Sequence, residues 1–227
     1  MVNVITFSLW GDKPIYNVGA IKNVELAKQY YPNFECWFYI HSPTVPENTI
    51  IELQKLENVK IIFKDGDLNT TKPETWRFEA IDDPNVEIMM SRDTDTRILL
   101  REKLAVDEWL ESGKIFHIMR DHPYHSSSIQ AGMFGTKKNS NIPSLCNLIN
   151  NYNQKCIRGY DQEFLRDIIY PIIKNDVMIH ASFCKQNGET GNYVKPFPIP
   201  YDVDYHFVGE YVYDDESRVI EHSNMLK

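Results

Sequence analysis

Apolar and polar residues alternate along the first third of the chain in blocks that predict strands and helices in turn. Val2–Leu9 is apolar and β-branched and is followed by Gly11 and Pro14, which is typical of a buried strand that ends in a loop. Apolar residues then recur every three or four positions over residues 18–31, which predicts a helix that Pro32 stops. The next blocks predict a strand at 36–40, a helix at 48–56 and a strand at 59–63.

The remaining blocks continue this alternation. Residues 64–74 are polar and rich in turn formers, which predicts a loop long enough to act as a flexible lid. Further helices are predicted at 75–81, Leu100–Glu111, 144–152 and 161–173, and further strands at 86–90, 115–119 and Val177–Ala181. From residue 183 onward the prolines and glycines predict loop with short strands.

This order of elements predicts an α/β protein with a Rossmann-like, mostly parallel central sheet and helices on both faces. No linker or repeat divides the sequence, so residues 1–227 are expected to form a single domain in which 183–227 are a loop-rich C-terminal extension. Sheets of this kind bind ligands at the carboxyl ends of their strands. Candidate chemistry is therefore sought where predicted strands end.

The composition excludes several classes of protein. The 227 residues are 42% hydrophobic and 25% charged, values that disfavour disordered, collagen-like and coiled-coil chains. Lys and Arg number 24 against 32 Asp and Glu, and the formal net charge of −8 disfavours a general nucleic-acid or anionic-membrane binder. A polyphosphate ligand would therefore need a metal ion or a few placed cations.

Targeting and cysteine patterns favour a protein of the cytoplasm. The first ten residues lack a basic region and a cleavage site, and no run of about 18 apolar residues occurs. We therefore expect a soluble, non-secreted protein without an integral membrane segment. Cys36, Cys146, Cys156 and Cys184 are widely spaced, which predicts scattered thiols in a reducing compartment.

The most informative motif is SRDTDTR at positions 91–97, directly after the apolar run VEIMM. In extended backbone, Asp93 and Asp95 point to the same side, so their carboxylates can share one hard divalent ion such as Mg²⁺ or Mn²⁺. The alternative is that both are turn or N-cap residues before the helix that begins near Leu100. The residues alone leave both interpretations open.

Longer segments resemble a group of glycosyltransferases with the GT-A fold. The resemblance rests on SRDTDTRILLREKLAVDEWL, FHIMRDHPYH, AGMFG, FSLWGDKPIYNVGAIKN, WRFEAIDDPNV and YDQEFLRDIIYPI, and it spans about residues 6–197. It implies a metal-dependent transferase that moves a sugar from a nucleotide-diphosphate donor to a hydroxyl acceptor such as a glycan. Asp93 and Asp95 would then hold Mn²⁺ or Mg²⁺ against the diphosphate, where a fixed cation stabilises the leaving group.

The resemblance also implies a third metal ligand. His180, at the end of the predicted strand VMIH, is the first candidate and His206 is a second. Lys195 begins a Lys-Pro-Phe sequence and is the candidate cation for the departing diphosphate. The alternatives are a hydrogen-bonded, half-buried histidine for His180 and a solvated surface lysine for Lys195.

Two aspartates are candidate catalytic residues. Asp161 and Gln162 open a predicted helix and resemble an Asp-Gln pair that lines the reaction centre of glycogenin-like enzymes, where Asp161 would act as a base or stabilise oxocarbenium-like charge. Its alternative role is an N-cap. Asp121 follows the strand that contains His117 and is expected to bind sugar hydroxyls, unless its loop is only a polar surface. The histidines at 117–125 match no common zinc spacing.

The nucleotide is expected beside the first strand. Phe7 and Trp10 offer apolar contact to a base, although Phe7 also fits the core. Arg77, Arg92 and Arg97 are candidate phosphate contacts or, alternatively, members of surface ion pairs. Two other functions remain open at this stage: a nucleotidyltransferase or phosphohydrolase with a carboxylate metal site, and a non-catalytic sugar-binding protein.

Overall fold

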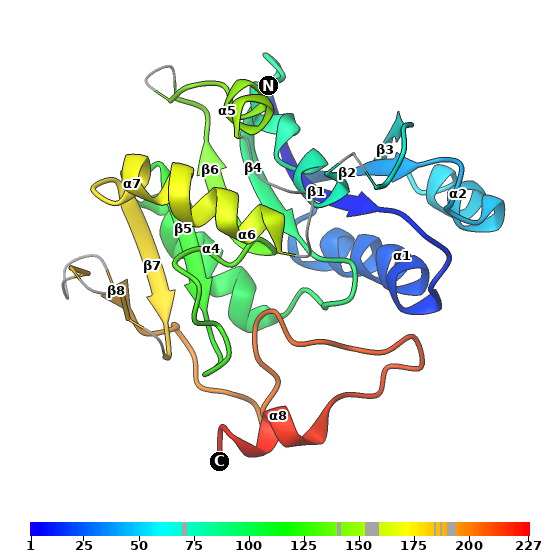
Figure 1. Ribbon diagram of the computed structural model, residues 1–227. Helices are drawn as coiled ribbons and strands as arrows, with labels where there is room; N and C mark the ends of the chain where they lie inside the picture. The colour runs from blue at the N-terminus through cyan, green and yellow to red at the C-terminus, as the bar shows by residue number, and fades with distance from the viewer. Residues whose placement is uncertain (70–71, 140–141, 153–158, 184, 187, 190–193) are drawn as a thin grey trace.

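One eight-stranded sheet organises the protein. The computed structural model describes residues 1–69, 72–139, 142–152, 159–183, 185–186, 188–189 and 194–227, so Cys156 and Cys184 and part of the expected lid lie outside the described residues. The strand order is β3-β2-β1-β4-β6-β5-β7-β8 (Figure 1). The strands are β1 (Val2–Leu9), β2 (Phe34–His41), β3 (Val59–Lys64), β4 (Val86–Arg92), β5 (Phe116–Arg120), β6 (Met133–Lys137), β7 (Val177–Ala181) and β8 (Val194–Lys195). Neighbouring strands are parallel except where β6 pairs with β4 and β5.

Helices cover both faces of the sheet, as the alternation predicts. One face packs against α1 (Pro14–Tyr30), α2 (Glu47–Gln54) and α4 (Leu100–Glu111). The other face packs against α3 (Pro73–Trp76), η1 (Glu79–Asp82), α5 (Leu145–Asn151), α6 (Tyr160–Phe164), η2 (Leu165–Ile169) and α7 (Tyr170–Ile173). A last short helix, α8 (Ile220–Asn224), ends the C-terminal segment (Figure 1). None of the described helices is long and apolar enough to cross a membrane.

Burial explains why the central strands read as continuous apolar runs. Six successive residues of β1, from Val4 to Leu9, are buried, as expected for a parallel strand covered on both faces. On one face Phe7 stacks on Phe38 with ring centroids 4.7 Å apart. On the other, Phe78 stacks on Phe164 at 6.5 Å.

The structure departs from the predicted elements in five places. The helix predicted at 18–31 begins four residues earlier at Pro14, which occupies the first helical turn, where its missing N–H costs nothing. The helix predicted at 75–81 is two short pieces, α3 and η1. The helix predicted at 161–173 contains a π-helical turn, η2, just before Pro171, which has no N–H to donate. Strand β6 and helix α8 were not expected.

A glycine in α1 lets that helix approach the loop that follows β4. A Cβ on Gly19 would lie 1.9 Å from the carbonyl oxygen of Thr94, so no other side chain fits without movement. One turn later, the Asn23 amide donates to the Thr96 carbonyl at 2.8 Å and its oxygen accepts from the Ile98 N–H at 3.2 Å. Helix α1 therefore fixes the backbone of residues 94–98.

We expect Gly19→Ala to destabilise the protein by about 1 to 3 kcal/mol, because the added methyl must push α1 away from Thr94. The free energy of unfolding in urea measures this loss. The matched control is Gly113→Ala, since a Cβ at Gly113 has no atom within 4 Å. Equal effects of the two substitutions would contradict the proposed contact.

Candidate active site

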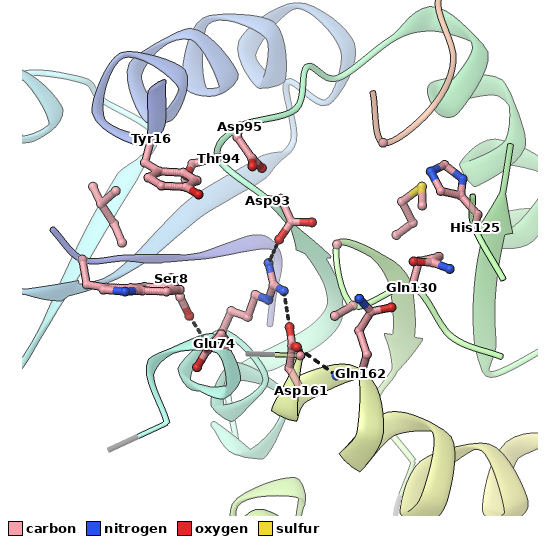
Figure 2. A pocket seen from close by; sticks show the side chains of 18 residues that line it. Ser8, Tyr16, Glu74, Asp93, Thr94, Asp95, His125, Gln130, Asp161 and Gln162 are labelled. Atoms are coloured by element: carbon pink, nitrogen blue, oxygen red, sulfur yellow. Dashed lines mark hydrogen bonds and ion pairs between the residues drawn. The ribbon is translucent and has the colours of Figure 1, made fainter. Parts of the chain in front are cut away.

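A cleft of about 320 Å³ opens at the carboxyl ends of β1 and β4 (Figure 2). Its walls come from segments far apart in the sequence. They are the end of β1, the first turn of α1, α3 with Arg77, the loop after β4, the segment before β6, the start of α6 and one glycine of the C-terminal segment. The lining residues are Ser8, Leu9, Trp10, Tyr16, Glu74, Arg77, Asp93, Thr94, Asp95, His125, Gln130, Ala131, Gly132, Met133, Gly159, Asp161, Gln162 and Gly209.

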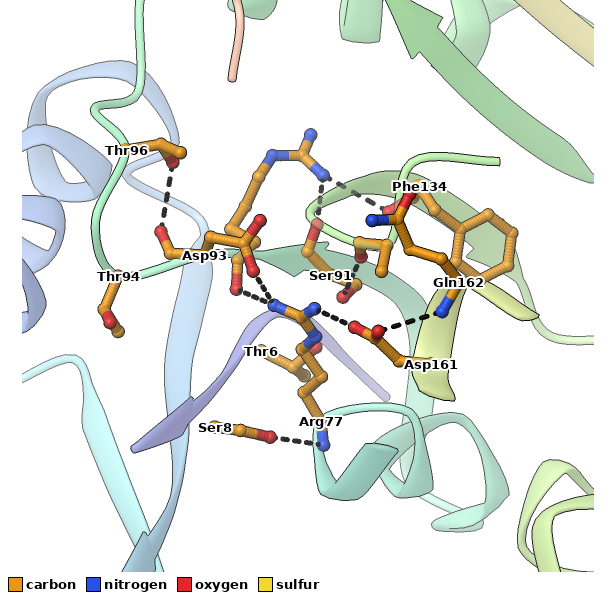
Figure 3. Close-up of polar contacts among 12 residues, drawn as sticks. Thr6, Ser8, Arg77, Ser91, Asp93, Thr94, Thr96, Phe134, Asp161 and Gln162 are labelled. Atoms are coloured by element: carbon orange, nitrogen blue, oxygen red, sulfur yellow. Dashed lines mark hydrogen bonds and ion pairs between the residues drawn. The ribbon is translucent and has the colours of Figure 1, made fainter. Parts of the chain in front are cut away.

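The guanidinium of Arg77 joins two carboxylates in this cleft (Figure 3). It forms an ion pair with Asp93 through Nη1, and its Nη2 lies 2.9 Å from Oδ2 of Asp161. Nη1 also donates to the carbonyl of Arg92 at 2.9 Å, and the backbone N–H of Arg77 donates to Oγ of Ser8 at 3.1 Å. Only 6% of the Arg77 side chain is exposed, so its charge depends on these partners.

The electrostatics of Arg77 and Asp161 follow from burial and pairing. Burial opposes the charge on Arg77, but Asp93 and Asp161 outweigh it and raise the pKa of the guanidinium. Burial also raises the pKa of Asp161, and Arg77 offsets part of that rise. Oδ1 of Asp161 accepts from the backbone N–H of Gln162 at 2.9 Å. The carboxylate is therefore oriented on both sides.

Asp93 and Asp95 both lie at the cleft, on either side of Thr94 (Figure 2). Burial raises the pKa of Asp95 to about 7, and the charge of Asp93 adds to this rise. Asp93 rests against Gly132, where a Cβ would lie only 1.9 Å from Oδ2. Gly132 thus makes room for a carboxylate rather than for a ligand. The charges of Arg77 and Arg97 offset part of the rise in the pKa of Asp95. Two neighbouring acids of this kind favour the binding of a further cation.

Of the other predicted site residues, Trp10, Arg77 and Gln162 also lie at the cleft. Trp10 borders it at the end of β1, on the side of Tyr16. The Gln162 Oε1 is buried, and it is one of the atoms for which no hydrogen-bond partner is found among the described residues.

Three predicted nucleotide contacts lie elsewhere. Phe7 is fully buried in the core. Arg92 is buried and pairs with Glu102 at 2.8 Å. Arg97 pairs with Glu216 at 2.8 Å and donates to the carbonyl of Tyr213. Each is held by partners inside the protein, so none reaches a ligand in this cleft.

Asp121 is a buried anchor and not a cleft residue. It is fully buried, and its two oxygens lie 2.8 Å from Nε and Nη2 of Arg101. It also accepts from Ser182 Oγ at 2.7 Å, Tyr201 Oη at 3.0 Å and the Val208 N–H at 3.0 Å. The prediction that it binds a sugar is wrong, because its acceptor positions already tie the C-terminal segment to β5.

The expected third metal ligand is also misplaced. His180 is fully buried in β7, with Nδ1 2.8 Å from Nε2 of His117 and Nε2 3.2 Å from Glu108. Lys195 is exposed and pairs with the same Glu108 at 3.3 Å. His206 pairs with the exposed Asp202 at 2.7 Å. None of these three residues lines the cleft. Lys195 is therefore not beside the carboxylates where a cation for the departing diphosphate was expected.

Sequence reasoning missed several cleft residues. Tyr16 and Glu74 come from the first turns of α1 and α3. They lie close in sequence to Trp10 and Arg77, which were predicted as site residues. Gln130 lies in the connection between β5 and β6, and no sequence pattern separated it from its polar neighbours. His125, in the same connection, was expected at the ligand edge of the sheet because it follows the end of a predicted strand. Gly209 reaches the cleft only because Asp121 and Arg97 hold the C-terminal segment in place.

Known structures share this fold at low sequence identity. No family model matches the sequence, and no curated protein matches it. An active-site mutant of the galactosyltransferase LgtC has a TM-score of 0.52 to this protein. The two sequences are 12% identical over 98% of this chain and 94% of that chain. A mannosyltransferase from Pyrobaculum calidifontis, in complex with GDP-Man and Mn²⁺, has a TM-score of 0.51 at 11% identity over 85% of this chain and 58% of that chain.

A nucleotidyltransferase is equally similar. A candidate glucose-1-phosphate thymidylyltransferase from Bacillus anthracis has a TM-score of 0.52 at 8% identity over 81% of this chain and 87% of that chain. At such identities the likeness concerns the fold alone. The chain therefore has a GT-A-type α/β fold, as its sequence resemblance implied.

We expect Arg77→Met to destabilise the protein by about 3 to 5 kcal/mol at pH 8, because it leaves the buried Asp161 without its cation. Urea unfolding measures the change. The control is Arg166→Met, since Arg166 pairs with Asp167 on the surface and such pairs contribute at most about 1 kcal/mol. A loss no larger than that of the control would contradict the assigned role of Arg77.

The raised pKa of Asp95 predicts how stability depends on pH without metal. A carboxyl group whose pKa is higher in the folded state stabilises the fold below its unfolded pKa of 3.8, and this contribution is lost as pH rises through about 7. In EDTA the melting temperature should therefore fall between pH 5 and pH 8. Asp95→Asn should flatten this part of the profile and be more stable than the wild type at pH 8, whereas the exposed Asp214→Asn should change neither.

Proposed function

We propose that the protein is a divalent-metal-dependent glycosyltransferase that moves a sugar from a nucleotide-diphosphate donor to a hydroxyl acceptor. One observation carries the proposal. The paired carboxylates of Asp93 and Asp95, after a central strand, share a cleft with the Arg77–Asp161 pair on a GT-A-type fold. The solved glycosyltransferases with this fold support the same class of reaction.

The charges in the cleft support a requirement for a cation. Among the described lining residues, four carboxylates face one guanidinium, which is already paired. A diphosphate entering this cleft alone would be repelled. A divalent ion held by Asp93 and Asp95 would reverse that balance.

The donor atoms fit Mg²⁺ or Mn²⁺. Among the described residues no group of three or more His, Cys, Asp or Glu side chains is arranged to hold a metal. Mg²⁺ is commonly held by one or two carboxylates together with water and substrate phosphates, so the pair Asp93 and Asp95 is a sufficient protein contribution. The ion, when bound, supplies charge that stabilises the departing diphosphate.

The chain's own groups fit the remaining tasks. Trp10 and Tyr16 border the end of the cleft beside β1 and offer aromatic faces to a nucleotide base. Arg77 pairs with both Asp93 and Asp161, so Asp161 lies beside the carboxylate pair. Asp161 supplies the carboxylate at the reaction centre, either as a base for the acceptor hydroxyl or as a partner for positive charge on the sugar. Arg77 favours the ionised form of that carboxylate and orients it.

A nucleotidyltransferase is the second candidate function. The thymidylyltransferase with the same fold favours it to the same degree as the glycosyltransferases do. The two functions differ in the reaction, because a nucleotidyltransferase joins a nucleoside triphosphate to a sugar phosphate and releases pyrophosphate and a nucleotide-diphosphate sugar. A glycosyltransferase binds a nucleotide-diphosphate sugar and releases the nucleoside diphosphate.

A thermal-shift screen of nucleoside diphosphates, triphosphates and nucleotide sugars, with Mn²⁺ or EDTA, tests the proposal. One diphosphate and its sugars should stabilise the protein only with Mn²⁺, by about 2.7 kcal/mol at 100 times the dissociation constant. Asp93→Asn and Asp95→Asn should each reduce this stabilisation, and the exposed Asp214→Asn should not.

Two results would contradict the proposal. Release of pyrophosphate from a nucleoside triphosphate and a sugar phosphate, without release of a nucleoside diphosphate from any nucleotide sugar, would favour the nucleotidyltransferase. Equal stabilisation of the wild type and of Asp95→Asn in Mn²⁺ would exclude the carboxylate pair as the metal site.

A further inference from the structure

The cleft has a charged end and an uncharged end. Asp93 and Asp95 lie on the side of Tyr16, whereas His125 and Gln130 lie on the opposite side, and Gln162 lies next to Asp161 between them (Figure 2). Between these side chains the wall is made by Gly132, Met133 and Gly209. The described residues of this end carry amide and imidazole groups and no permanent charge.

Hydrogen bonding fixes the tautomer of His125. The backbone N–H of Asp121 donates to Nδ1 of His125 at 3.0 Å, and because that N–H can only donate, Nδ1 must be the unprotonated nitrogen. The ring proton is therefore on Nε2. Burial, together with the nearby His122 and His222, lowers the pKa of His125 to about 3, so the ring is neutral. His125 lines the cleft and carries a neutral N–H donor at Nε2.

The surroundings of His125 hold the ring still. It contacts His122 and Phe207, with ring centroids 5.8 Å away in each case. A Cβ on Gly209 would lie 3.4 Å from its Cε1, so the C-terminal segment passes directly over the ring. A donor held this firmly loses little entropy when it binds a ligand.

Gln162 contributes the opposite kind of group. Its Oε1 is buried and without a partner among the described residues, and a buried acceptor in this state costs stability until something donates to it. The side chain lies at the cleft, next to Gln130 (Figure 2). A sugar hydroxyl is both a donor and an acceptor, so one ring can satisfy Gln162 and accept from His125.

We propose that this end of the cleft binds the ring of an uncharged sugar, with Nε2–H of His125 donating to a ring hydroxyl and Oε1 of Gln162 accepting from another. The inference rests on the proposed function and adds the class of sugar. A sugar carrying a carboxylate or a phosphate would face Asp161 and Asp93 across the cleft, and Arg77, the cation among the described lining residues, is already paired with both. The sugar belongs either to the donor or to the acceptor.

The test compares wild type, His125→Phe and His125→Gln. The probes are the nucleoside diphosphate selected by the thermal-shift screen, its sugar conjugates, and methyl glycosides of glucose, galactose, mannose and glucuronic acid, all with Mn²⁺. The phenylalanine keeps an aromatic ring but removes both the Nε2–H donor and the Nδ1 acceptor of the Asp121 N–H. Glutamine returns an N–H near the position of Nε2, so recovery in that variant assigns the loss to the donor. His206→Phe is the control, because His206 does not line this cleft.

We expect a neutral sugar to bind three- to tenfold more weakly to His125→Phe, the effect of losing one hydrogen bond, and to recover in His125→Gln. Affinity for the nucleoside diphosphate should be unchanged in every variant. A loss confined to the nucleotide sugar places the donor sugar at His125, and a loss confined to the methyl glycosides places the acceptor there. In ¹⁵N spectra of the histidine rings, His125 should show the Nε2–H tautomer with and without ligand.

The outcomes separate this inference from the proposed function. If the nucleoside diphosphate binds with Mn²⁺ but His125→Phe leaves every sugar affinity unchanged, or if glucuronic acid is the preferred sugar, the inference is wrong and the proposed function stands. If no nucleoside diphosphate binds the wild type with Mn²⁺, the proposed function fails and the sugar subsite fails with it.

Discussion

The pairing of Arg77 with Asp93 and Asp161 is the interaction on which the rest of the site depends. The two carboxylates come from segments 16 and 84 residues away in the sequence, and the guanidinium is almost fully buried between them. A charge in that position is tolerated only when its partners are already in place. Helix α3, the end of β4 and the start of α6 must therefore assemble together, and the cleft is the space that remains beside them.

Surrounding ion pairs set the far wall of the cleft. Arg97 holds the C-terminal segment through Glu216, the Val212 N–H donates to the carbonyl of Asp95 at 2.9 Å, and Asp121 binds the Val208 N–H. Arg97 and Asp121 were expected to contact a ligand. Each instead binds the C-terminal segment and fixes its backbone. By fixing residues 208–213 they bring Gly209 to the cleft and close it above His125.

The predictability of the fold and of the site has a common physical limit. Alternation of strands and helices was readable because buried parallel strands are continuous apolar runs, and β6 was missed because MFGTK contains glycine and is short. Asp93, Asp95, Arg77 and Asp161 were found because each begins or follows an element end. Whether a charged residue faces a ligand or an internal partner depends on contacts across many residues, such as the 119 positions between Arg97 and Glu216, and sequence pattern does not contain them.

The unfavourable electrostatics of the cleft are best understood together with ligand binding. Burial and the charge of Asp93 make the ionised form of Asp95 costly, and the Oε1 of Gln162 lacks a donor among the described residues. Both features reduce stability in the absence of ligand. A divalent ion between the carboxylates would remove the cost of ionising Asp95, and a ligand hydroxyl would donate to Oε1 of Gln162. Part of the binding free energy would then come from removing these two unfavourable terms. The same residues would then couple the metal to the sugar, since Arg77 links Asp93 to Asp161 and Gln162 follows Asp161 directly on α6.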